Sequence, residues 1–217
     1  MKATAGGLAI VHCSPSLLVF DKPSGLPSVP GRPEALQDCL SARAQAAFGD
    51  ARVVHRLDMA TSGLIVLARG ADAQRRLGIA FAQREVDKGY VAVVDGLVPL
   101  PGGDGWGEID LPLAADWPRR PRQQVCASGR RSVTRYRVLG HDGAPCRTRL
   151  ELQPITGRTH QLRVHLQAIG HPILGDALYA PAVVQAKAPR LLLHAHALTV
   201  PDPSSGERLR FDSPPPF

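Results

Sequence analysis

Long hydrophobic runs are missing from this chain of 217 residues. No stretch approaches the about 18 consecutive apolar residues that a membrane-spanning helix needs, so no membrane span is predicted. The first 16 residues contain one Lys and only a brief apolar run, which does not match a secretory signal with a cleavage site. We therefore expect a cytoplasmic protein with no membrane partner.

Cysteine is scarce and dispersed. The four cysteines show no CxxC pairing, which argues against a zinc knuckle or a compact disulfide framework and favours reduced thiols: Cys13, Cys39, Cys126 and Cys146. Five histidines of the C-terminal half invite a metal site, but no HExxH or clustered Cys/His spacing accompanies them: His160, His165, His171, His194 and His196. The prediction is a protein without a bound metal.

Acidic residues are outnumbered, 19 against 26 Lys and Arg, which gives a formal net charge of +7. This balance favours a polyanionic partner, because basic side chains that neutralise phosphates release counterions. The densest basic segment is Asp116–Arg131, with five Arg and Trp117. A solvated loop is the simpler interpretation, but prolines that hold it extended and an aromatic for stacking favour contact with RNA.

The remaining composition is that of a globular, loop-rich protein, with 44% hydrophobic residues, 20 Pro and 21 Gly. Its length suits one large domain or two closely packed lobes. Strand-like runs alternate with a few helical ones, which predicts an α+β fold on a mixed, mostly antiparallel sheet. The expected strands are Leu8–His12, Leu17–Phe20, Leu64–Ala68, Tyr90–Val94, Val133–Leu139, Cys146–Leu152 and Leu191–Val200, and the expected helices are Glu34–Phe48, Ala71–Glu85 and Thr159–Ile169.

The stretch VVHRLDMATSGLIVLAR, residues 53–69, places a polar run between two apolar runs. Asp58 lies on a loop that enters a buried strand, which is a usual position for a catalytic group. Gly63 marks a kink or a close approach where a side chain would not fit. On physical grounds alone, a turn capped by Asp58 through Thr61 or Ser62 is an equally good interpretation.

His55-Arg56-Leu57-Asp58 followed by Thr61-Ser62-Gly63 resembles the HRLDxxTSG signature of the RluA-type pseudouridine synthases. Two further blocks are similar to the same family, Lys88–Ala92 and Pro154–Asp176, so the resemblance covers most of the chain. It implies the pseudouridine synthase fold, with flanking helices and a central active-site cleft. It also implies a single catalytic domain over residues 1–217, without the N-terminal S4 domain of many larger relatives.

The resemblance implies an enzyme that isomerises uridine in RNA and needs no cofactor. Asp58 would be the catalytic residue, either attacking C1′ or accepting a proton from C2′, and the sequence leaves both roles open. Arg163 would pair with Asp58, Tyr90 would pack against the target base, and Arg56 would enter the space that the flipped base leaves. We expect the other RNA contacts from His55, Arg119, Arg120, Arg122 and Arg158.

The resemblance extends to the short dual-specificity members of the family, through Pro27–Arg32 and Asp116-Trp117-Pro118. It suggests a monomer that modifies the transfer RNA anticodon stem-loop and a hairpin of 23S ribosomal RNA. Two rival hypotheses are a non-catalytic basic RNA-binding protein and a metal-dependent nuclease that uses Asp58 and Asp176.

Overall fold

The structure is a computed structural model that describes residues 4–143 and 146–217. The chain divides into two compact units, Met1–Lys88 with His194–Pro216, and Gly89–Leu193 with Phe217. The single catalytic domain expected over residues 1–217 stays a prediction. Within the described residues, no helix combines the length and the apolar character needed to cross a membrane.

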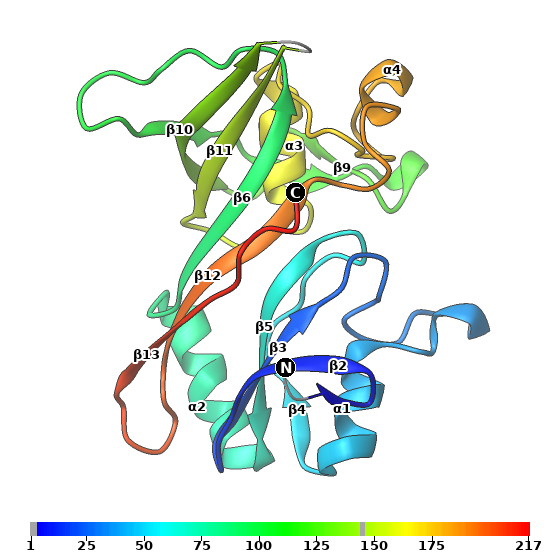
Figure 1. Ribbon diagram of the computed structural model, residues 1–217, viewed down its shortest axis with the longest axis vertical. Helices are drawn as coiled ribbons and strands as arrows, with labels where there is room; N and C mark the ends of the chain where they lie inside the picture. The colour runs from blue at the N-terminus through cyan, green and yellow to red at the C-terminus, as the bar shows by residue number, and fades with distance from the viewer. Residues whose placement is uncertain (1–3, 144–145) are drawn as a thin grey trace. The chain divides into compact units, whose positions relative to one another are not determined.

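The first unit is built on a sheet around β5 (Ser62–Arg69) (Figure 1). Residues 62–68 of this strand are all buried. A strand buried on both faces explains the unbroken apolar run of the sequence. The strand order is β1 (Thr4–Ala5), β2 (Leu8–Cys13), β3 (Leu17–Lys22), β5 and β12 (Leu193–Pro201), with β4 (Ala51–Val53) on β5 and β13 (Arg208–Asp212) on β12. Because β12 runs parallel to β5 and the other pairs are antiparallel, the sheet is mixed.

Helix α2 (Gly70–Gln83) packs on β5 through Ala73, Leu77 and Ala80, which repeat at helical spacing and are buried. The predicted helix Glu34–Phe48 is wrong in its first half. That segment is a short 3₁₀ helix η1 (Glu34–Leu36), and α1 (Leu40–Phe48) begins only after Cys39. Cys39 has extended backbone and its Sγ accepts a hydrogen bond from the Ala42 amide, so it acts as an N-cap that the sequence did not signal.

The second unit contains an antiparallel sheet in the order β6 (Asp87–Asp95), β11 (Cys146–Pro154), β10 (Val133–Gly143) and β7 (Gly107–Asp110). Helix α3 (Gln161–Ala168) lies against β10 and β11 (Figure 1). The remaining elements are the hairpin β8 (Leu113–Ala115) and β9 (Gln123–Val125), the 3₁₀ helix η2 (Trp117–Arg119) and the short helix α4 (Ala182–Gln185). The predicted α+β class with a mixed, largely antiparallel sheet is confirmed, whereas the central cleft stays a prediction.

Candidate active site

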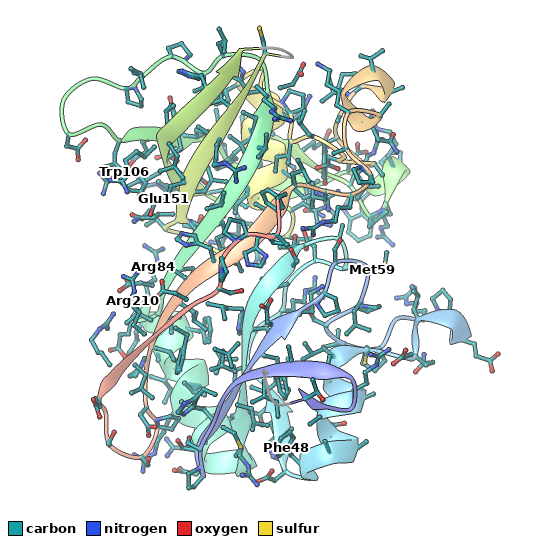
Figure 2. The ribbon with its side chains drawn as sticks, in the orientation of Figure 1. Phe48, Met59, Arg84, Trp106, Glu151 and Arg210 are labelled. Carbon is teal, nitrogen blue, oxygen red and sulfur yellow. The ribbon has the colours of Figure 1, made fainter. Side chains whose placement is uncertain are left out.

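Asp58 lies on the loop between β4 and β5 and is half-buried. The Thr61 amide donates to the Asp58 carbonyl oxygen at 3.1 Å, which closes a turn just before β5 begins. Arg56 and Met59, on either side of Asp58, are exposed. Figure 2 labels Met59. The loop is therefore fixed at the edge of a buried strand and remains open to a large partner.

The segment Pro23–Ser28 holds this loop from the other side. Ser28 Oγ donates to the Leu57 carbonyl at 2.7 Å and accepts from the Leu57 amide at 3.1 Å. Ser24 Oγ donates to the Ala60 carbonyl at 2.7 Å, beyond Asp58 in the chain. Hydrogen bonds before and after Asp58 leave its backbone little freedom, which is the preorganisation that a catalytic group needs.

Lys22 is a charged residue with no exposed surface, at the end of β3. Its Nζ donates to three backbone carbonyls, those of Pro23 at 2.9 Å, Leu26 at 2.8 Å and Met59 at 3.1 Å. Burial lowers the pKa of Lys22 to about 8, and the negative charge of Asp58 opposes this shift. Lys22 thus anchors the residue next to Asp58 and supplies a positive charge beneath the loop, a role that the sequence interpretation missed.

Ser62 ties the start of β5 to β12 and to the end of β13 through buried polar groups. Ser62 Oγ lies 2.9 Å from His194 Nδ1, and His194 Nε2 lies 3.3 Å from Ser213 Oγ. Ser213 Oγ donates to Asp21 Oδ2 at 2.7 Å. Polar groups in the interior that hydrogen-bond to one another fix a single arrangement of the strands. This network of hydrogen bonds therefore stabilises the end of the Asp58 loop.

The close approach predicted at Gly63 is confirmed. Its φ is +108°, and a Cβ added there would lie 2.3 Å from the carbonyl oxygen of Ala195, its parallel partner on β12. Any larger residue would push the two strands apart, because backbone atoms cannot yield as a flexible side chain can.

The side chain of His55 makes its contacts within the first unit. Its Nε2 accepts from the Val66 amide at 3.0 Å, and its ring stacks on Phe81 with centroids 4.7 Å apart. Burial and the positive charge of Lys88 lower the pKa of His55 to about 3, which agrees with a neutral ring that accepts at Nε2. The RNA contact expected from His55 stays a prediction, and its structural role was not foreseen.

In the second unit, Arg163 is 4% exposed and makes a two-point ion pair with Asp176. Its Nε donates to Asp176 Oδ2 at 2.8 Å and its Nη2 donates to Oδ1 at 2.6 Å. The guanidinium lies 5.0 Å from the ring centroid of Tyr179. Burial rules out a simple surface arginine, and a fixed positive charge is held in place. The pairing of Arg163 with Asp58 stays a prediction.

Tyr90 is half-buried on β6, opposite Leu152 of β11. Its ring is thus mounted on a regular strand of the second unit, as expected from the sequence, and its contact with a target base stays a prediction.

The basic segment after Asp116 is folded. Arg119 Nε lies 2.7 Å from Asp116 Oδ2, and Arg120 stacks its guanidinium 3.3 Å from the ring centroid of Trp117. Trp117 is 67% exposed, so this stacked pair faces the solvent. Arg158 is exposed and donates from Nε to the Arg131 carbonyl at 3.4 Å. These cationic groups are presented on the surface, where phosphates can reach them.

Four of the histidines that invite a metal interpretation, His194 included, contact other polar groups. His160 Nδ1 contacts Tyr179 Oη, His165 lies between Thr134 and the Leu111 carbonyl, and His171 Nδ1 contacts the Asp95 carbonyl. Among residues 4–143 and 146–217, no three His, Cys, Asp or Glu side chains gather as a metal would require.

Comparisons with known proteins point to one family. The family described as RNA pseudouridylate synthase matches residues 16–168. The dual-specificity RNA pseudouridine synthase RluA of Escherichia coli K12 is 48% identical over 97% of this chain and 94% of its own length. The protein of the same name from Haemophilus ducreyi is 46% identical over 93% and 90%. Human RNA pseudouridylate synthase domain containing 1 superposes with a TM-score of 0.81 at 28% identity, over 100% of this chain and 87% of that one.

Proposed function

The chain belongs to the RNA pseudouridylate synthase family and is an RNA pseudouridine synthase, and we propose that Asp58 carries out its isomerisation of uridine. The reaction breaks the N1–C1′ bond, turns the uracil and rejoins it through C5. Asp58 acts as a carboxylate at the ribose, either as the nucleophile at C1′ or as the base at C2′. The observation that carries this proposal is the fixed loop of Asp58. Serine hydroxyls hydrogen-bond to the loop before and after Asp58, and the ammonium of Lys22 hydrogen-bonds to the Met59 carbonyl.

Three further residues have proposed roles around the target uridine. Tyr90 packs against the extruded base and Arg163 supplies the positive charge that accompanies Asp58. Arg56, exposed next to the catalytic loop, enters the space that the base leaves in the RNA. Extrusion of a base costs a few kcal/mol, so contacts of this kind offset part of it.

Binding of the RNA backbone is assigned to the exposed Arg119, Arg120 and Arg158 and to the half-buried Arg122, with His55 as an additional contact. The net charge of +7 and the solvent-facing pair of Arg120 and Trp117 support this assignment.

The substrates that we propose are the anticodon stem-loop of transfer RNA and a hairpin of 23S ribosomal RNA. The curated relatives from Escherichia coli and Haemophilus ducreyi are named dual-specificity enzymes, and the high identity along nearly the whole chain supports the same range here. We also propose that the enzyme works as a monomer in the cytoplasm. Sedimentation velocity of the purified protein tests the monomer, and a stable dimer would refute it.

Mapping pseudouridine in cells that lack this protein tests the function and the substrates together. We expect the loss of a site in transfer RNA and of a site in 23S ribosomal RNA. Both sites should return with the wild-type gene and with Asp38→Asn, which changes an exposed carboxylate of the same unit. Neither should return with Asp58→Asn. Restoration by Asp58→Asn would refute Asp58 as the catalytic residue.

A further inference from the structure

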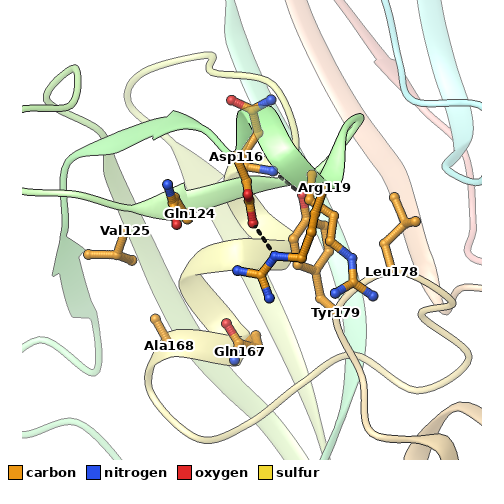
Figure 3. A pocket seen from close by; sticks show the side chains of 10 residues that line it. Asp116, Arg119, Gln124, Val125, Gln167, Ala168, Leu178 and Tyr179 are labelled. Carbon is orange, nitrogen blue, oxygen red and sulfur yellow. Dashed lines mark hydrogen bonds and ion pairs between the residues drawn. The ribbon is translucent and has the colours of Figure 1, made fainter.

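A cavity of about 270 Å³ lies in the second unit, between the β9 hairpin, the end of α3 and the loop that follows it (Figure 3). It is smaller than the about 300–1,000 Å³ of pockets that hold drug-sized ligands. This volume suits a single flat heterocycle.

The walls of the cavity combine amides with apolar surface. Gln124 on β9 and Gln167 on α3 line it together with the apolar side chains of Val125, Ala168 and Leu178 (Figure 3). A side-chain amide presents a donor and an acceptor next to each other, which matches the edge of a nucleobase, and glutamine pairs in this way with adenine. Apolar side chains suit the flat faces of the same ring.

The charges at the cavity favour nucleic acid over other ligands. Asp116 is the one carboxylate among the lining residues, all of which are described, and Arg119 compensates it at 2.7 Å. Arg122 also lines the cavity. A base that enters is followed by its phosphate, and these guanidinium groups can hold that phosphate at the rim.

One wall of the cavity is rigid and connects to Arg163. Tyr179 Oη accepts from the Gln123 amide at 2.8 Å and lies 2.6 Å from His160 Nδ1. The Tyr179 amide donates to Asp176 Oδ1 at 3.1 Å, and the ring stacks on Arg163. An occupant of the cavity therefore touches a side chain that also holds the buried ion pair of Arg163.

We propose that this cavity binds one unpaired nucleobase of the substrate RNA, other than the uridine that is isomerised, and that Gln124 and Gln167 recognise its edge. The proposal rests on the proposed function, since it names a second recognition site of the same enzyme. An adenine is the base that best fits two amides.

The test uses a stem-loop RNA in which each loop nucleotide except the target uridine is replaced in turn by an abasic residue. For the wild type we expect one position at which the abasic change lowers kcat/KM at least about tenfold, the effect of losing a stacked and hydrogen-bonded base. Gln124→Ala with Gln167→Ala should lower kcat/KM for the intact stem-loop by a similar factor and should show no further loss with that abasic RNA. Gln83→Ala, an exposed glutamine at the end of α2, is the matched control and should behave as the wild type.

Three results would overturn the proposal. Wild-type enzyme that tolerates every abasic position would show that no second base is bound. Losses from the double variant and from the abasic RNA that multiply would show that they act at different places. A double variant with wild-type kcat/KM, beside an Arg122→Ala variant that flattens the salt dependence of KM, would identify the occupant as a phosphate. Turnover of the intact stem-loop by the wild type is measured first, and if there is none, the proposed function fails and this inference with it.

Discussion

Replacement of Lys22 by Met removes the positive charge beneath the Asp58 loop and keeps a similar side-chain volume. The difference between a pKa of 10.5 in the unfolded chain and about 8 in the fold means that burial disfavours the ammonium by about 3 kcal/mol. Lys22→Met removes this penalty but leaves three backbone carbonyls without their donor, at about 1 kcal/mol or more each. These terms offset one another, so we expect the free energy of unfolding at pH 7 to change by less than about 2 kcal/mol.

Catalysis should respond much more strongly than stability to Lys22→Met. The Met59 carbonyl next to Asp58 loses its anchor, and misplacement of a reacting group by about 1 Å can cost about 100-fold in rate. We expect kcat on a stem-loop RNA to fall at least about tenfold. The wild-type kcat should also decline as the pH rises through about 8, where Lys22 loses its proton in the fold. This decline should be absent in Lys22→Met.

The pH dependence of stability gives an independent check on Lys22. Between pH 8 and pH 10.5 the unfolded chain still binds a proton that the folded chain has released. The cost of burying the Lys22 ammonium is therefore complete below pH 8 and is relieved as the pH rises from 8 to 10.5. Over this range, the free energy of unfolding of the wild type should rise relative to that of Lys22→Met. Urea unfolding at several pH values measures this difference. Lys187→Met, which changes a lysine paired with Asp95 near the surface, is the control. A Lys22→Met enzyme with wild-type kcat and an unchanged alkaline decline would refute the reasoning.

Three further predictions concern other parts of the chain. The pKa of His55 is about 3 in the fold and 6.5 ordinarily, so the stability that depends on its neutral ring is complete above pH 6.5 and is lost as the pH falls toward 3. In urea unfolding, His55→Gln should lack this loss of stability at low pH. Asp176→Asn leaves the buried guanidinium of Arg163 without its counter-charge and should lower the free energy of unfolding by about 3–5 kcal/mol. An unchanged Tm in thermal denaturation would contradict this prediction. The triple change of Arg119, Arg120 and Arg122 to Ala should weaken RNA binding and flatten its salt dependence with little effect on kcat, and full affinity with lost turnover would contradict this assignment.

Periodicity was enough to place several of the longer elements of this chain, although it put the start of α1 too early. The buried strand at residues 64–68 and the helix at residues 71–85 carry patterns that a packed core requires, and β5 and α2 are found there. The shortest strands, such as β4 with three residues and β1 with two, offer no pattern of their own. They exist because a neighbouring strand provides hydrogen-bonding partners, which is a tertiary effect.

The candidate site was partly predictable for a related reason. The HRLDxxTSG motif indicated Asp58, and a glycine directly before a buried strand indicated a close approach at Gly63. Lys22 follows a short apolar run, and nothing in the sequence indicates its burial, because only the folded loops bring three carbonyls to its ammonium. The sequence suggests for Asp176 only the role of a nuclease carboxylate, because no local pattern indicates its ion pair with Arg163.

The most direct test of the central claim is tritium release from a stem-loop RNA that carries 5-³H-uridine, measured with the wild type and Asp58→Asn at matched RNA occupancy. Formation of the new C1′–C5 bond expels the hydrogen from C5, so the wild type should release tritium at its target position. Asp58→Asn should bind the RNA with similar affinity and release none, because a group that acts in the transition state affects rate more than binding. Asp38→Asn should match the wild type. Tritium release by Asp58→Asn at a rate close to that of the wild type would contradict the assignment of catalysis to Asp58.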